Sequence, residues 1–258
     1  MTASPHLTFG RALRAESIKL ASLRSTWWTL GITAALSVGI ALLIAAAASG
    51  SGGMGDDTAG VMSIVAPMQF TMMVAGIFGA IAITGEYATG MIRSTLTAEP
   101  RRGAVLLAKA VAVTLFLVIT VLLSTVIAVA VTTPIFGDEG IDWSEPARSV
   151  VPLVYSLLAM ASFGLLGLGW GFIIRSGAGA IAATIGVLFV APIVVNLFFI
   201  GGEAWQWIVD LGTYLPMSAA QVLTTPGAED LPTALVTIIA WPTAALLGGW
   251  LLLRSRDA

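Results

Sequence analysis

Long uninterrupted apolar runs constrain this chain more than any other feature. Six can be placed, at 27–48, 61–83, 105–132, 150–174, 178–200 and 233–253. A helix of about 20 apolar residues crosses the hydrocarbon core of a bilayer. The runs are continuous rather than alternating in polarity, which disfavours β-barrel strands. Only 10% of the residues are charged, against about 25% in a soluble domain. We therefore predict an all-α integral membrane protein with six transmembrane helices.

The apolar runs divide the chain into three parts. Residues 1–26 form a basic, amphipathic N-terminal segment, residues 27–253 the membrane domain, and residues 254–258 a short tail. The first run is longer than the roughly 7–15-residue core of a secretory signal peptide. We therefore expect it to remain as the first transmembrane helix.

Charge is distributed unevenly between the two sides of this six-span arrangement. All but one of the 12 basic residues fall on the side of the two termini, and Arg148 is the exception. Ten acids fall on the other side: Asp56, Asp57, Asp138, Glu139, Asp142, Glu145, Glu203, Asp210, Glu229 and Asp230. Loops rich in Lys and Arg remain in the cytoplasm. Both termini are therefore predicted to be cytoplasmic.

A charged insert, "TGEYATGMIRSTLTAEPRR" (84–102), separates the second and third runs. Its middle part predicts a short helix that starts after Gly90, and Pro100 stops it because a residue before proline is pushed out of the α region. Four residues share the apolar face of this helix, and Arg93 lies off it; the four are Met91, Ile92, Thr95 and Leu96. A short helix with one apolar face is typical of a docking element.

The extended stretch "GEYATGMIRSTLTAEPRRGAVLLAKA" resembles the first cytoplasmic loop of ABC-2 type permeases, the membrane subunits of many bacterial ABC exporters. The matching positions are Glu86, Gly90, Ile92 to Leu96, Pro100 with Arg101, and Lys109. The N-terminal "AESIKLASLRSTWWTL" (15–30) is similar to actinobacterial members of that family. The final outer loop, with "YLPMSAAQVL" (214–223), also agrees with it.

The resemblance implies an ABC-2, type V exporter-like bundle in a bacterial cell membrane. Two such subunits, as a homodimer or as a heterodimer with a related permease, would form the translocation path. The loop at 84–104 would dock into a separate ATPase. The coupling residues implied are Glu86, Gly90, Met91, Ile92, Arg93, Thr95, Leu96, Pro100 and Arg101.

ATP chemistry is assigned to the partner. The chain has no Gly-x-x-x-x-Gly-Lys-Ser/Thr phosphate loop, so ATP and Mg²⁺ are expected in the ATPase and no cofactor in this chain. No nucleic-acid partner is expected. An intramembrane enzyme needs ionisable groups at depth, and the centres of the six runs contain none. The alternative to a transport subunit is a non-transporting membrane partner of an ATPase: a scaffold, a sensor or an immunity protein.

Several single residues keep two interpretations. Glu86 pairs either with a loop arginine or with a basic residue of the N-terminal segment, or it simply reaches water. Arg93, Arg101 and Arg102 contact the ATPase, or they anchor topology and attract anionic lipid. The N-terminal segment predicts a helix along the inner leaflet with Leu13, Leu20 and Leu23 toward lipid, although Glu16 falls near that face.

Two polar residues interrupt otherwise apolar runs. Gln69 and Asn196 either form hydrogen bonds between helices or contact cargo, and they are the only candidates for substrate binding that the sequence offers. With no buried charge in the path to pair with an ion, we expect a hydrophobic or amphipathic cargo.

Overall fold

A computed structural model describes residues 8–50, 58–137 and 141–255. Within these ranges all regular structure is helical, which confirms the all-α class. Six helical segments are long and apolar enough to cross a membrane, as predicted. They are Arg24–Ser49, Ala59–Thr89, Arg102–Phe136, Val150–Ile174, Gly177–Gly201 and Leu231–Ser255. Residues 1–7 and 256–258 of the predicted terminal segments, and the acids Asp56, Asp57, Asp138 and Glu139, lie outside the described ranges.

Most helices extend a few residues past the apolar runs, because a helix continues into its polar flanks. The elements are α1 (Phe9–Ser22), α2 (Arg24–Gly50), α3 (Ala59–Val65), α4 (Met68–Thr89), α5 (Met91–Ala98), α6 (Arg102–Phe136), α7 (Val150–Ile174), α8 (Gly177–Ile185), the π-helix η2 (Gly186–Val190), α9 (Ala191–Leu197), the 3-10 turns η3 (Phe198–Gly201) and η4 (Glu203–Trp205), α10 (Gln206–Gly212), α11 (Pro216–Thr224) and α12 (Leu231–Ser255). The second span breaks between α3 and α4 at Pro67, and the π-helical turn precedes Pro192. Proline lacks the N–H that would continue the helical ladder.

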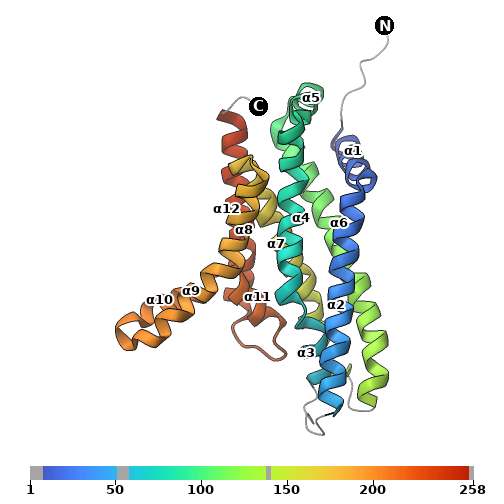
Figure 1. The fold of residues 1–258 in the computed structure, drawn as a ribbon, viewed down its shortest axis with the longest axis vertical. Helices are drawn as coiled ribbons and strands as arrows, with labels where there is room; N and C mark the ends of the chain where they lie inside the picture. Colours follow the sequence, from blue (N-terminus) through green and yellow to red (C-terminus); the bar gives the residue numbers. More distant parts are fainter. Residues whose placement is uncertain (1–7, 51–57, 138–140, 256–258) are drawn as a thin grey trace.

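The first and last described residues lie at the same end of the bundle, together with α5 (Figure 1). This end also carries the basic residues of α1, of the α5 region and of the end of α12. We call it the basic end. Helices α3 and α11 lie toward the opposite end.

The α4–α7 pair is the most extensive helix contact in the bundle, and small residues make it close. A Cβ atom added to Gly79 would overlap the carbonyl oxygen of Gly164, and one on Gly167 would overlap that of Gly76. A Cβ atom added to Gly171 would overlap the side chain of Ile83. Small residues let membrane helices approach to backbone contact, and the stretch "GLGWG" (167–171) supplies Gly167 and Gly171 to this contact.

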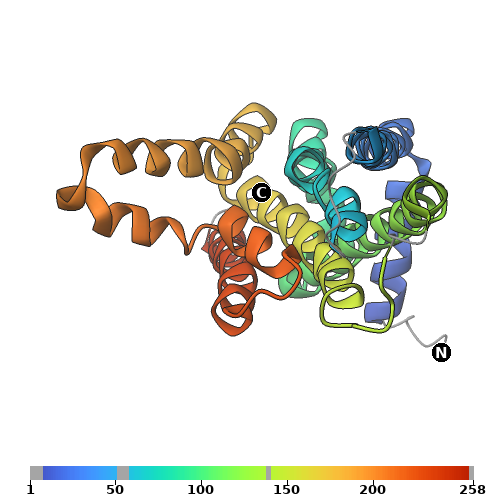
Figure 2. The same ribbon diagram turned by 90° about the horizontal axis from the view of Figure 1, so that it is seen from below.

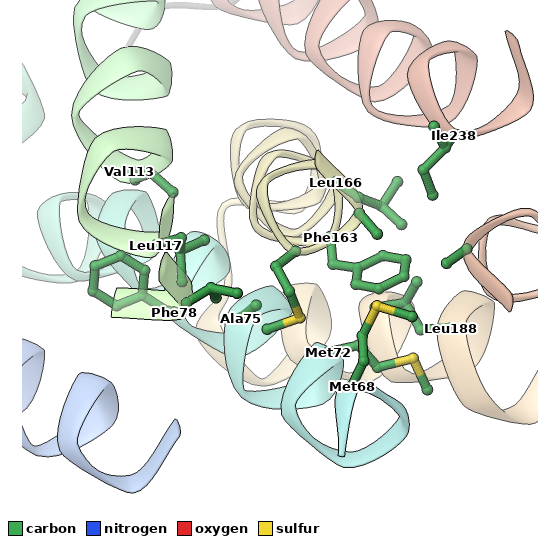
Figure 3. Close-up of a cluster of buried hydrophobic side chains, with 14 of the residues drawn as sticks. Met68, Met72, Ala75, Phe78, Val113, Leu117, Phe163, Leu166, Leu188 and Ile238 are labelled. Atoms are coloured by element: carbon green, nitrogen blue, oxygen red, sulfur yellow. The ribbon is translucent and has the colours of Figure 1, made fainter. Parts of the chain in front are cut away.

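The main core lies where α4, α6, α7 and α12 converge. Figure 3 shows the side chains of Met68 and Met72 against Phe163 and Leu188. Phe163 and Leu188 are fully buried, and Met72 is 1% exposed. Methionine fills irregular gaps around an aromatic ring, and the core therefore joins the π-helical turn of the fifth span to α4 and α7.

Beyond that turn the fifth span leaves the bundle. In Figures 1 and 2 the segment from α9 to α10 (Ala191–Gly212) projects sideways as a helical hairpin, which we call the lateral arm. Only 11% of the most apolar stretch of the fifth span is buried, compared with 67% of the corresponding stretch of α7. After the arm the chain returns through α11, which packs on α7 and α12.

Candidate coupling site at the basic end

The turn from α4 into α5 depends on one glycine. Gly90 has φ +70°, the left-handed conformation that a glycine adopts without a Cβ penalty. Its N–H donates to the carbonyl of Tyr87, and α5 starts at the next residue. The helix stops at Ala98, because Glu99 takes the extended conformation that Pro100 requires.

A side-chain clamp fixes the turn from α5 into α6. Arg101 donates from Nε to Oε1 of Glu99 at 2.8 Å and from Nη2 to Oε2 at 3.0 Å. The backbone N–H of Arg101 also donates to Oε1, at 3.2 Å. These hydrogen bonds lower the pKa of the Glu99 carboxyl below its usual 4.5. Paired bonds of this kind add directional specificity, so the orientation of α5 is fixed at both of its ends.

Four charged side chains meet behind α5. Lys109 of α6 donates to Oε2 of Glu16 in α1 and, at 2.9 Å, to Oε1 of Glu86 in α4. Lys19 of α1 donates to Oε1 of Glu16 at 2.7 Å, to Oε1 of Glu86 at 3.1 Å and to Oγ1 of Thr95 in α5 at 3.2 Å. We call Glu16, Lys19, Glu86 and Lys109 the charge cluster. It joins three helices that are distant in sequence, α1, α4 and α6, and the bond from Lys19 to Thr95 adds α5.

Burial makes the charge cluster energetically important. The side chains of Glu16 and Glu86 are each 5% exposed, that of Lys109 is 2% exposed, and that of Lys19 is 30% exposed. Removing one member of a buried ion pair leaves an uncompensated charge, which typically costs about 3–5 kcal/mol. The ion pairs of the cluster therefore connect α1, α4 and α6, and Lys19 connects them to α5 through Thr95.

The two α1 members of the cluster titrate away from their ordinary ranges. Burial alone would raise the pKa of Glu16, but the charges and hydrogen bonds of Lys109 and Lys19 outweigh it and hold that pKa below 4.5. Burial would lower the pKa of Lys19, yet its bonds to Glu16 and Glu86 hold that pKa above 10.5. Both groups are therefore charged across the physiological range.

Ile92 and Leu96 of the apolar face predicted on α5 pack against the protein itself, which corrects our expectation that the whole face would be free to dock. Ile92 is 2% exposed and belongs to a cluster with Leu106, Phe172 and Leu253, and Leu96 packs against that cluster. Met91, the first residue of the predicted face, is instead exposed, and the exposed surface of α5 comprises Met91, Arg93, Ser94, Thr97 and Ala98. We call this set the outer face of α5.

The apolar face of α1 is corrected in the same sense. Leu20 is buried in the main core and Leu13 packs against it, so these two leucines face the bundle and not the lipid. Only Leu23 of the predicted three is exposed, at 50%. Glu16 lies on this face because it pairs with Lys109, which explains the apparent defect in amphipathicity.

Two arginines bond the end of α12 to the same region. Arg102 donates from Nη1 to the carbonyls of Leu253 and Arg254, and Arg175 donates from Nη2 to that of Leu252 at 3.3 Å. The last carbonyls of a helix have no partner within it, and basic side chains satisfy them well. The basic end is thus one connected unit of α1, α4, α5, α6 and α12.

The family model described as ABC-2 family transporter protein matches residues 12–202, well over half of the sequence. This chain belongs to the ABC-2 transporter family. No curated protein sequence matches it. The match begins in α1 and ends in the lateral arm, so it includes the charge cluster and all of α5. The predicted family and fold are therefore confirmed, and membership of this family supports a general role as a membrane permease.

The two residues of the permease that are candidates for binding cargo both lie on its exposed surface. Gln69 lies on the exposed side of α4 near its start, and Asn196 on the exposed side of the lateral arm. Asn196 donates from Nδ2 to the carbonyl of Pro192, one turn earlier in its own helix, at 2.9 Å. This bond is not the interhelical one that the sequence suggests, and a role in cargo binding stays a prediction for both residues.

Sequence reasoning missed Glu16 as a functional residue. The signal was present, because an acid on the apolar stripe of a short helix needs a buried cation opposite it. For Glu86 the sequence left two kinds of partner open, and the structure pairs it with Lys19 of the N-terminal segment and with Lys109.

Proposed function

We propose that this permease is the membrane subunit of an ABC exporter, driven by a separate ATPase that binds the outer face of α5. One observation supports this above all: α5 is clamped at both ends, packed along one side and still exposed along the other. A short helix held this rigidly transmits a push to the elements behind it instead of absorbing it.

A force that the ATPase applies to α5 would reach the other helices through the contacts of α5. Its inner face packs on the cluster that contains Leu106 of α6, Phe172 of α7 and Leu253 of α12. Through Thr95 it bonds Lys19, and through the charge cluster it reaches α1 and α4. Nucleotide-driven movement of an ATPase on α5 would therefore rotate several helices together.

The proposal sets the basic end in the cytoplasm of a bacterial cell. Loops rich in Lys and Arg are retained there, and the ATP pool is on that side. The outer face of α5 is flanked by the exposed Arg101 and carries Arg93, but no acid. An acidic or neutral groove on the ATPase would complement it.

A second permease subunit completes the path in this proposal, and the lateral arm is the surface we assign to it. The arm exposes Asn196 in the middle of an apolar segment. A polar amide that faces lipid is costly, whereas one that faces another helix finds hydrogen-bond partners. A like or related subunit is therefore a better neighbour for the arm than lipid alone.

Reconstitution with the cognate ATPase tests the function directly. The complex in proteoliposomes should move an amphipathic cargo in an ATP-dependent way, and Arg93→Glu should abolish ATPase stimulation without lowering the yield of folded permease. Arg148→Glu, at the opposite end of the bundle, is the matched control and should leave stimulation unchanged. Stimulation without any flux would indicate a non-transporting scaffold or sensor, and unchanged stimulation in Arg93→Glu would refute docking at α5.

A further inference from the structure

A cavity of about 300 Å³, open on one side, lies beside the charge cluster and is lined by α1, α2, α4, the start of α5, and α6. Its walls are mainly apolar, with Leu20, Leu23, Phe78 and Ile81 among them. The two carboxylates and two ammonium groups of the charge cluster close one end. Ligand pockets typically begin at about 300 Å³. The cavity therefore has room for one small amphiphile.

The cavity lies at the boundary between membrane and water. Ser25, Thr26 and Thr29 in the first turns of α2 line it. Trp27 and Trp28 in the same turn are 60% and 74% exposed, and tryptophan concentrates at the level of the lipid headgroups. The rim includes exposed residues of α4 and α5, namely Ile81, Gly85, Thr89 and Met91. A molecule in the inner leaflet could enter from the side.

The chemistry of the closed end points to a donor. Oε1 of Glu86 accepts from both lysines, whereas Oε2 is buried and has no hydrogen-bond partner among the described residues. The ammonium group of Lys19 already donates three hydrogen bonds, to Glu16, Glu86 and Thr95. A buried carboxylate oxygen without a partner is uncommon. A head group with N–H donors would satisfy it through a charge-assisted hydrogen bond.

We propose that this cavity binds an amphiphile with a primary ammonium head. The ammonium donates to the carboxylate of Glu86, and the apolar body lies along Leu20, Phe78 and Ile81. A bilayer lipid with an aminoethyl head and a soluble cationic amphiphile share this chemistry. The inference rests on the proposed function only in calling such a molecule cargo, since binding itself requires no ATPase.

Binding of tritiated decylamine to the permease in phosphatidylcholine nanodiscs tests the proposal. Decylamine should bind saturably, and decanol and decanoate should compete at least about tenfold less well, because each lacks the ammonium. Glu86→Gln should weaken binding about tenfold. Gly85→Leu provides a variant that leaves every charge in place: a Cβ there meets open space, and the larger side chain would fill the cavity.

The controls separate the outcomes. Gly31→Leu also points into open space but does not line the cavity, so it should bind decylamine as the wild type does. Competition by phosphatidylethanolamine added to the nanodisc would identify an aminolipid as the natural source, and its absence would identify a soluble amphiphile. Equal binding of decanol and decylamine, or unchanged binding in Gly85→Leu, overturns the proposal. Loss of ATP-driven flux with intact decylamine binding would count against the exporter function instead.

Discussion

Replacing Lys109 by methionine isolates the energy of the charge cluster. Methionine keeps most of the aliphatic volume and removes the charge, so Glu16 and Glu86 lose their shared buried cation. Both carboxylates are almost fully buried, so solvent screens them little, and we expect a loss of about 3–5 kcal/mol of folding free energy. For a protein of this size that corresponds to a fall in Tm on the order of 10 °C.

Thermal unfolding of the detergent-purified protein, followed by tryptophan fluorescence, measures this change. The chain supplies a matched control in the Glu145–Arg148 pair, whose side chains are 58% and 56% exposed. An exposed pair contributes about 0–1 kcal/mol. Arg148→Met should therefore shift the Tm by only a degree or two, roughly.

A compensated variant distinguishes lost charge pairing from lost packing. In Lys109→Met combined with Glu16→Gln and Glu86→Gln, no buried charge is left unpaired, and replacement of a whole buried ionic group is often close to neutral. Lys19 then loses both partners but is 30% exposed and can reach water. The Tm should recover much of its loss. The reasoning would be refuted if the Tm of Lys109→Met were no lower than that of Arg148→Met. It would also be refuted if the Tm of the combined variant were no higher than that of Lys109→Met alone.

Three further predictions concern the same helices. Leu96→Asp should lower the Tm and the yield of folded protein, because Leu96 packs on the cluster around Leu253; Ser94→Asp on the exposed outer face should leave both unchanged, and equal effects would contradict the assigned orientation of α5. Gly79→Ala should destabilise by about 1–3 kcal/mol through its overlap with the Gly164 carbonyl, whereas Gly31→Ala, which meets nothing, should be neutral or slightly stabilising. The lowered pKa of Glu16 contributes stability above about pH 4.5 that is lost as the pH falls, and the raised pKa of Lys19 contributes stability that is lost as the pH rises through and above 10.5. Glu16→Gln should therefore flatten the acid limb of a curve of Tm against pH and leave the shape of the curve near neutral pH as in the wild type. A steeper acid limb would contradict the pairing of Glu16.

The sequence predicts the helices well because a bilayer permits few alternatives. Apolar length identifies each span, and Gly90 and Pro100 mark the ends of the short helix because their backbone restrictions are local. The close α4–α7 packing could also be anticipated from Gly167 and Gly171. These features depend on residues within one or two turns of each other.

What the sequence could not decide was the direction in which an amphipathic helix faces. The stripe of Ile92 and Leu96 fits a docking surface or an inward-facing surface equally well, and only the positions of Leu106, Phe172 and Leu253 decide between them. The same ambiguity affected Leu13 and Leu20 of α1. The pairing of Glu16 with Lys109 joins residues 93 positions apart, and no local pattern specifies such a contact.

Site-specific crosslinking from α5 tests the central claim most directly. The chain has no cysteine, so Ser94→Cys carries the only thiol to which a short photo-crosslinker can be attached, and Ser144→Cys provides the same probe at the opposite end of the bundle. In cells that express the cognate ATPase, the probe at 94 should crosslink to that ATPase and the probe at 144 should not. Crosslinking of the ATPase from 144, or none from 94 when the permease and the ATPase co-purify, would contradict coupling through the outer face of α5.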